Sequence, residues 1–254
     1  MKNAATYQIK TTARYFTVLV MVAASFLTFG GCSLDRTLVS EYSFDGNPLA
    51  DCTVYVEEAG ELVPYLVLTA DYNGSGKTLL LRKHVMDEPR TYNPNVQGNS
   101  YYAGSEIDEW LSGAYLLLVG NVDAVEVPIE ISTKDSLNHC GLDIETIHRK
   151  AFLLSWLEVG GPEGVTIAPD GRELAYFVWN KALGTRADGT EEPYALRSPI
   201  TCANTAYSVV GSNGKFGGAG LEYKLMVRPA FCVESDAEVA LVEDGERGRV
   251  PVLS

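Results

Sequence analysis

Arginine and tyrosine side chains are the residues of this chain best suited to binding a ligand. An arginine can hold a carboxylate or a sulfate through two parallel N–H donors. A tyrosine combines an apolar ring, which can stack on a sugar or fill a protein interface, with a polar tip. Half or more of the tyrosines are expected in the core. The candidate binding residues are Tyr101, Tyr102, Tyr194, Arg197 and Tyr207.

The arginines also have a structural interpretation. Arg197 and Arg228 each follow an apolar residue on a predicted strand and lie near a proline. An arginine that ties two loops together through backbone carbonyls or a buried acid produces the same pattern. A sequence pattern alone does not assign a role, so both interpretations stand as hypotheses.

The patterns typical of catalysis are missing from the sequence. Ser198 has no Gly-x-Ser-x-Gly context, and the three histidines share no pattern with it, so a turn hydrogen bond before Pro199 is expected instead. Residues 74–78 resemble the end of a phosphate-binding loop, but Asp71 stands where the loop needs its first glycine. We predict no catalytic residue and no cofactor. Calcium is conceivable from the acidic charge, although no calcium-loop motif supports it.

Cys32 follows a segment typical of protein export. Residues 15–31 are almost entirely apolar and end in two glycines, and the basic residues Lys2, Lys10 and Arg14 precede this run. This order predicts a signal peptide over residues 1–32, and the cysteine after two glycines predicts cleavage before Cys32 and lipidation of its sulfur. A plain cleaved signal and a retained anchor are the alternatives, because Phe29 stands where lipidation favours a small aliphatic residue. All three place residues 33–254 outside the cytoplasm, and lipidation would make the membrane a partner through Cys32.

The other four cysteines, Cys52, Cys140, Cys202 and Cys232, leave three disulfide connectivities open. Cys202 and Cys232 flank a predicted run of strands, which favours a bond between them. The alternative is that some are small buried thiols. No spacing among the cysteines and histidines suggests a zinc site.

Charge excludes one class of partner. The chain carries 20 basic and 33 acidic residues, a net charge of −13. Residues 1–31 hold three of the basic and none of the acidic ones, so the exported part has 17 against 33, or −16. Such a polyanion is repelled by phosphate backbones, and we expect no nucleic-acid binding.

The periodicity of the chain predicts an α+β fold. Two apolar runs around an Asn-Gly turn predict a hairpin over residues 63–81, and Ser105 predicts the cap of a helix over 105–111. A second helix is expected over 144–156, and the last third is expected to be rich in strands. The predicted divisions are a tether with a candidate edge strand over 33–60, a domain over 61–235, and an acidic tail over 236–254.

Several separated segments resemble one family. Leu196-Arg197-Ser198-Pro199 is followed by Val227-Arg228-Pro229-Ala230-Phe231, and upstream lie the segments 79–81, 105–111 and 151–155. Together they resemble a family of exported bacterial domains of unknown function, over residues 61–235. Two features depart from the family pattern: Tyr194-Ala195 replaces its aromatic pair, and residues 160–192 match poorly.

The resemblance implies a C-type-lectin-like fold, related to formylglycine-generating, sulfatase-modifying domains, with small twisted antiparallel sheets, two helices and long loops. It implies a cell-surface domain that binds an extracellular carbohydrate or protein through its loops. Two alternatives remain. One is an oxidoreductase of the formylglycine-generating type, which needs a redox-active cysteine pair or copper-binding thiols close together; Cys202 and Cys232 are the candidates, although the motif around them is not matched. The other is a structural envelope lipoprotein without a ligand pocket.

Overall fold

The computed structural model describes residues 36–93, 100–163, 167–201 and 206–253. Residues 36–254 form one compact unit, which is longer at both ends than the expected domain over 61–235. The predicted signal peptide with Cys32 lies outside the described residues, as does Cys202.

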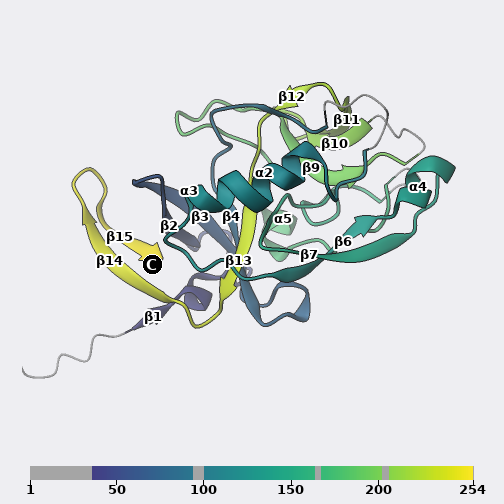
Figure 1. The fold of residues 1–254 in the computed structure, drawn as a ribbon. Coiled ribbons are helices and arrows are strands. Elements are labelled where there is room, and N and C mark those ends of the chain that lie inside the picture. Colours follow the sequence, from purple (N-terminus) through teal and green to yellow (C-terminus); the bar gives the residue numbers. More distant parts are fainter. Residues whose placement is uncertain (1–35, 94–99, 164–166, 202–205, 254) are drawn as a thin grey trace, which may run out of the picture. The chain divides into compact units, whose positions relative to one another are not determined.

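An eight-stranded mixed sheet organises this unit (Figure 1). Neighbouring strands are antiparallel except for β15 and β2, which pair in parallel. The sheet is larger than the small antiparallel sheets expected from the sequence. Its strand order is β1 (Thr37–Leu38), β14 (Glu238–Asp244), β15 (Gly248–Leu253), β2 (Thr53–Glu58), β3 (Glu61–Thr69), β4 (Lys77–Arg82), β13 (Ala230–Glu234) and β8 (Ala151–Phe152).

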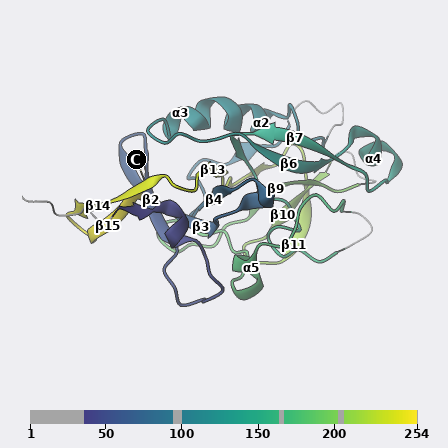
Figure 2. The same ribbon diagram turned by 90° about the horizontal axis from the view of Figure 1, so that it is seen from below.

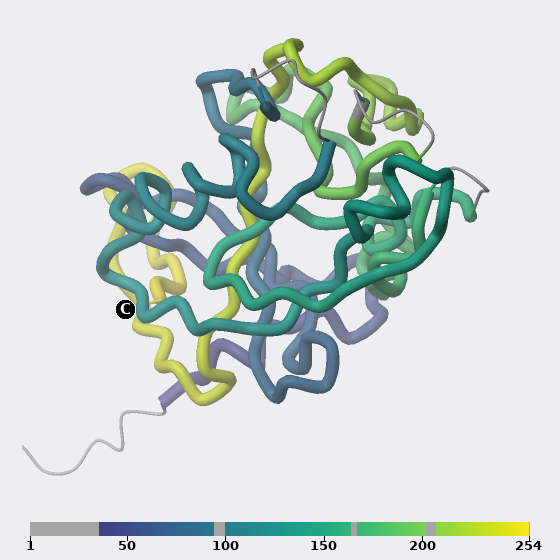
Figure 3. Tube along the Cα trace, turned by 45° about the vertical axis from the view of Figure 1, so that its right-hand side comes forward, coloured from purple at the N-terminus to yellow at the C-terminus, as the bar shows by residue number. Residues whose placement is uncertain are grey.

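The predicted hairpin is confirmed as β3 and β4. The short turn η2 (Tyr72–Gly74) joins the strands, and Asn73 and Gly74 have φ angles of 52° and 72°. Asparagine and glycine tolerate this left-handed region, which explains why the turn forms here. Figure 3 shows β13, in yellow, beside the bluish β4, although the two strands lie far apart in the sequence.

The predicted helix over 105–111 is also confirmed and is longer than expected. It comprises α2 (Glu106–Trp110), a π-helical turn η3 (Leu111–Tyr115) and α3 (Leu116–Leu118). The Ser105 hydroxyl accepts a hydrogen bond from the Asp108 amide at 3.3 Å, as a helix cap does. Ile107, Leu111 and Tyr115 are buried at four-residue intervals and pack this face against the core.

The helix expected over 144–156 is wrong. Residues Ile144–Arg149 form β7, which pairs with β6 (Val127–Ser132), and Ala151–Phe152 form β8. Along β7, exposed and half-buried side chains alternate, which is the period of a strand at a surface. Residues 151–156 are all buried, so their continuous apolar run reflects the core rather than a helical face.

The segment expected to be an acidic tail, residues 236–254, instead contains the hairpin β14–β15 over residues 238–253. Val239, Val250 and Leu253 are buried between these strands and the rest of the unit. The far part of the hairpin is exposed instead, and Leu241 and Val242 of β14 are 54% and 40% exposed. Since β15 pairs with β2, β2 is an interior strand rather than the edge strand expected within residues 33–60.

Three smaller sheets and short helices complete the unit, which is mostly β and at most α+β. Figure 2 shows α5 on the opposite side of the main sheet from α2 and α3. These remaining elements are β9 (Tyr194–Pro199), β10 (Ala206–Val210), β11 (Phe216–Gly220), β5 (Arg90–Thr91), β12 (Lys224–Leu225), η1 (Val39–Tyr42), α4 (Lys134–His139) and α5 (Ala175–Trp179).

Candidate functional site

Four of the five predicted binding residues lie in the core. Tyr102, Tyr194, Arg197 and Tyr207 are each at most 2% exposed. Tyr92 joins two of them, because its ring stacks on Tyr207 at 4.3 Å and its hydroxyl donates to the Arg197 carbonyl. These four residues therefore cannot form a binding surface. The rings of Tyr92, Tyr102 and Tyr207 pack β10 against the loop before α2.

Tyr101 is the predicted residue that reaches the surface. Its hydroxyl donates to Glu145 Oε1 at 2.7 Å, and the Lys134 ammonium lies 4.8 Å from its ring centroid. Partial burial, together with the Glu145 carboxylate, raises the pKa of Tyr101 to about 12. The side chain thus already has partners within the β6–β7 hairpin and its connection.

Arg197 forms a fully buried ion pair with Glu158. Both side chains are 0% exposed, and the guanidinium donates to both carboxylate oxygens at 2.6 and 2.9 Å. Its remaining N–H groups donate to the backbone carbonyls of Glu130, Leu153 and Asp170. Every polar contact of this guanidinium is internal, so the structural interpretation of Arg197 is the one the geometry supports.

The Arg197–Glu158 pair connects three separate segments. Tyr72 of η2 donates to Glu158 Oε1 at 2.6 Å, and Arg197 reaches the Glu130 carbonyl on β6 and the Asp170 carbonyl before α5. The chain also passes very close to the pair at Gly171, where an added Cβ would lie 2.9 Å from Glu158 Cγ. One buried contact therefore fixes η2, β6 and the segment leading to α5 relative to each other.

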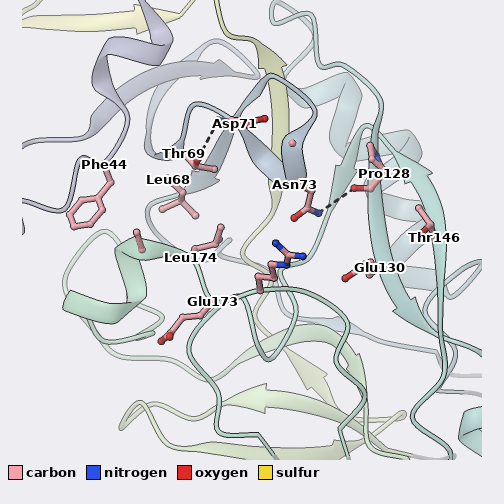
Figure 4. A pocket seen from close by; sticks show the side chains of 13 residues that line it. Phe44, Leu68, Thr69, Asp71, Asn73, Pro128, Glu130, Thr146, Glu173 and Leu174 are labelled. Carbon is pink, nitrogen blue, oxygen red and sulfur yellow. Dashed lines mark hydrogen bonds between the residues drawn. The ribbon is translucent and has the colours of Figure 1, made fainter.

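These three segments form the walls of a half-open pocket of about 550 Å³ (Figure 4). Phe44, Leu68 and Leu174 give it an apolar part. Glu130 and Thr146 are direct cross-strand partners on β6 and β7, so their side chains share one face of that hairpin. The other lining residues are Thr69, Asp71, Asn73, Gly74, Pro128, Arg172, Glu173 and Ala175.

The polar groups of this pocket are largely free to meet a ligand. Within the described part of the chain, the side chains of Glu130, Arg172 and Glu173 form no hydrogen bond or ion pair with another residue. Asp71 uses one oxygen to accept the Gly76 amide at 2.7 Å. The Asn73 amide nitrogen donates to the Pro128 carbonyl at 3.5 Å, which leaves the amide oxygen as an acceptor. The Arg197–Glu158 pair differs in this respect, because its charged groups all have partners inside the protein.

Sequence reasoning missed this pocket for two reasons. Arg172 and Glu173 lie in residues 160–192, the part that matched the family pattern poorly, and the acidic residues are scattered along the chain. No local spacing predicts that Asp71, Glu130 and Glu173 line one pocket, because strand pairing and the buried ion pair place their segments there over long sequence distances. The one local pattern that could have indicated the pocket is the charged pair Arg172-Glu173, directly after the Asp170-Gly171 turn.

The side chains of Arg228 and Ser198 also make their hydrogen bonds inside the protein. The Arg228 guanidinium is 5% exposed and donates to the carbonyls of Arg82, Lys83 and Leu183. The Ser198 hydroxyl accepts the Trp156 amide at 2.7 Å across the core. Neither residue is among those that line the pocket.

The predicted Cys202–Cys232 disulfide is wrong, because Cys232 is a free thiol on β13 with no exposed surface. Burial, and secondarily the Glu158 charge, raise the pKa of this thiol well above its usual value, so it is a poor nucleophile. Cys52 is also a free buried thiol, whereas Cys140 is disulfide-bonded. A strand in the middle of a sheet, paired on both sides, leaves Cys232 little access to another cysteine.

In residues 36–93, 100–163, 167–201 and 206–253, no three His, Cys, Asp or Glu side chains are grouped so as to hold a metal ion. None of the helices in this same part of the chain is long and apolar enough to cross a membrane.

Comparison with known proteins identifies a family for more than half of the chain. Residues 75–235 match the model of a domain of unknown function, DUF6273, and the chain belongs to this family. The matched region contains Arg197, Glu158 and the pocket residues on β6 and before α5, but it begins after Asp71 and Asn73. No curated protein and no solved structure matches the chain.

Proposed function

We propose that this member of the DUF6273 family is an exported, lipid-anchored surface protein that binds an extracellular carbohydrate in the pocket between η2, β6 and α5. The observation that carries the proposal is the set of unpaired polar groups around an apolar floor. Sugars need hydrogen-bond partners for their hydroxyls and an apolar surface for their C–H faces, and this pocket offers both. A surface protein whose exposed groups fit the same pocket is the other occupant considered.

Rigidity supports the same proposal. The Arg197–Glu158 pair holds all three pocket walls from behind, so the polar groups are positioned before a ligand arrives. A preformed site loses less conformational entropy on binding than a mobile one. The placement of the pocket on loops and strand ends also agrees with a C-type-lectin-like fold, which we propose as the finer description of this α+β unit.

The proposal of export and anchoring rests on the segment before the compact unit. The basic head, the apolar run and the two glycines before Cys32 support cleavage and lipidation, which would anchor residues 33–254 to the envelope. A diacylated cysteine supplies the second chain that stable anchoring requires.

A glycan array provides the first test. Purified residues 33–254, which contain the whole compact unit, are applied to an array and to cell-wall fractions with and without calcium. We expect a reproducible carbohydrate hit that the double variant Glu130→Gln/Arg172→Ala loses, because both groups line the pocket and have no structural partner. Since no metal site is found among the described residues, the hit is expected in both conditions.

Tyr101→Phe is the matched control for the array. It removes the hydroxyl of a half-buried tyrosine in the loop before α2, which contacts Glu145 of β7, without touching the pocket lining. Binding that survives the double variant and disappears in Tyr101→Phe would move the site to that tyrosine. Silence of the folded protein on every surface would contradict carbohydrate binding.

A further inference from the structure

Asp170 is a buried acid directly before one wall of the pocket. Its side chain is 0% exposed, and neither carboxylate oxygen has a hydrogen-bond partner among the described residues. Residues 172–175 follow it in the chain and all line the pocket, and Figure 4 shows Glu173 and Leu174 of this segment. A buried carboxyl without hydrogen bonds is uncommon, because it has lost its water and gained no partner. Its charge state therefore bears on a group only two residues from the pocket lining.

The groups that face Asp170 suit its neutral form. Arg197 of β9 is the cation that faces it, and that guanidinium is already paired with Glu158. Glu158 and Tyr92 are the other titratable groups near the carboxyl, and the Ser198 hydroxyl lies close to it. One cation thus faces two buried acids, so the cluster is electrically neutral only while Asp170 holds its proton.

Two hydrogen bonds tie the segment 170–175 to the Arg197–Glu158 pair. Arg197 donates to the Asp170 carbonyl at 2.8 Å, and the Leu174 amide donates to the Glu158 carbonyl at 3.0 Å. The Leu174 side chain is half-buried, and residues 172, 173 and 175 are exposed. Since little of this segment is buried, moving it away from the pair exposes less apolar surface than unfolding the sheet does.

We propose that ionisation of Asp170 releases the segment 170–175 from the Arg197–Glu158 pair, so that the pocket is complete only while Asp170 is protonated. The inference rests on the proposed function and names a regulation of that site. An ionised carboxylate needs donors or water, and no described residue donates to either oxygen in hydrogen-bond geometry. Outward movement of the exposed segment brings the carboxylate to water. Carbohydrate binding is therefore strongest at mildly acidic pH.

Amide hydrogen exchange tests the movement on residues 33–254 without a ligand. We expect the protection of the Leu174 amide, corrected for the exchange rate of a free amide, to fall about tenfold between pH 6 and pH 8. The factor follows because burial raises the pKa of Asp170 to about 7, against a usual value of about 4 in the open form. Exchange at Leu174 should depend little on urea, whereas exchange in β4 should depend steeply on it, because only β4 needs global unfolding.

Two variants identify the titrating group. In Asp170→Asn, the Leu174 amide should be equally protected at both pH values, whereas His148→Gln should behave as the unaltered protein. His148 is the direct cross-strand partner of the lining residue Pro128, and histidine is the residue type that normally changes charge in this range. A urea dependence at Leu174 as steep as in β4, or a pH dependence that persists in Asp170→Asn, would overturn the release.

The glycan array at pH 6 and pH 8 tests the consequence for binding. We expect a carbohydrate signal at pH 6 that is at least about threefold weaker at pH 8, because the open form does not bind, and equal signals at both pH values for Asp170→Asn. Equal signals for the unaltered protein, with the segment released at pH 8, would overturn the control of binding by Asp170. Silence at both pH values, with the release observed, would contradict the proposed function and leave the movement standing.

Discussion

Replacing Arg197 by leucine is expected to lower the free energy of unfolding by about 3–5 kcal/mol. The substitution leaves the Glu158 carboxylate at 0% exposure with Tyr72 and the Ser155 amide as partners but without its counter-ion. It also removes the donors that the carbonyls of Glu130 and Asp170 accept from. Urea unfolding followed by circular dichroism measures the change, provided that the transition is two-state.

Two further variants show whether the buried charge is the cause. Arg228→Leu removes an arginine that is buried to a similar degree but donates only to backbone carbonyls, so its cost is expected to be smaller, about 1–3 kcal/mol. The double variant Arg197→Leu/Glu158→Leu removes both charges and should be more stable than Arg197→Leu alone. Equal costs for Arg197→Leu and Arg228→Leu, with no recovery in the double variant, would contradict the role assigned to the ion pair.

Asp170 is expected to make the protein less stable as the pH rises. The side chain has no exposed surface, and neither carboxylate oxygen has a hydrogen-bond partner among the described residues. Burial raises the pKa of Asp170 to about 7, against the smaller opposing effects of the Arg197 charge and the nearby Ser198 hydroxyl. The Ser198 hydroxyl favours the ionised form by its proximity, but it does not meet hydrogen-bond geometry with either oxygen.

The direction of this pH dependence follows from the number of protons that the folded and the unfolded states bind. The folded state holds the Asp170 proton up to about pH 7, whereas the unfolded chain releases it near its usual pKa of about 4. The folded state therefore binds more protons between these values, and the stabilising contribution, complete below about pH 4, is lost as the pH rises to about 7. The difference amounts to roughly 4 kcal/mol.

The comparison with Asp170→Asn isolates this effect. The variant should lack this part of the pH dependence, and above pH 7 it should be more stable than the unaltered protein, as measured by urea unfolding from pH 4 to 8. Asp188→Asn is the control, because hydrogen bonds from Thr190 lower the pKa of Asp188 and keep this exposed group ionised over that range. Parallel stability curves for Asp170→Asn and the unaltered protein would show that Asp170 is not protonated in the fold.

The parts of the fold that the sequence predicted are local. The Asn73-Gly74 turn and the Ser105 cap are short-range signals, and both elements form as expected. Residues 144–156 were misassigned because Ile144 and Ile147 fit a helical spacing, although exposure alternates along β7 with the period of a strand. The parallel pairing of β15 with β2 depends on residues about 200 positions apart, for which no local pattern exists.

The candidate pocket was less predictable from the sequence than the fold. Tyrosine and arginine have the same chemistry in a core as at a surface, so residue type did not reveal that Tyr102, Tyr207 and Arg197 are buried. Arg197 nevertheless supports the pocket, because its hydrogen bonds hold the two segments that carry the lining residues Glu130 and Arg172. The segment 196–199, on which the family resemblance was based, therefore supports the pocket rather than lining it.

Chemical-shift mapping is the most direct test of the central claim, that the pocket held by the Arg197–Glu158 pair binds a carbohydrate. Isotope-labelled residues 33–254 are titrated with the sugar that the array identifies, and amide shifts are followed residue by residue. We expect the largest shifts to cluster at Asn73, Glu130, Thr146 and the segment 172–175. Shifts that cluster around Tyr101 and Glu145, with the pocket amides unchanged, would contradict it.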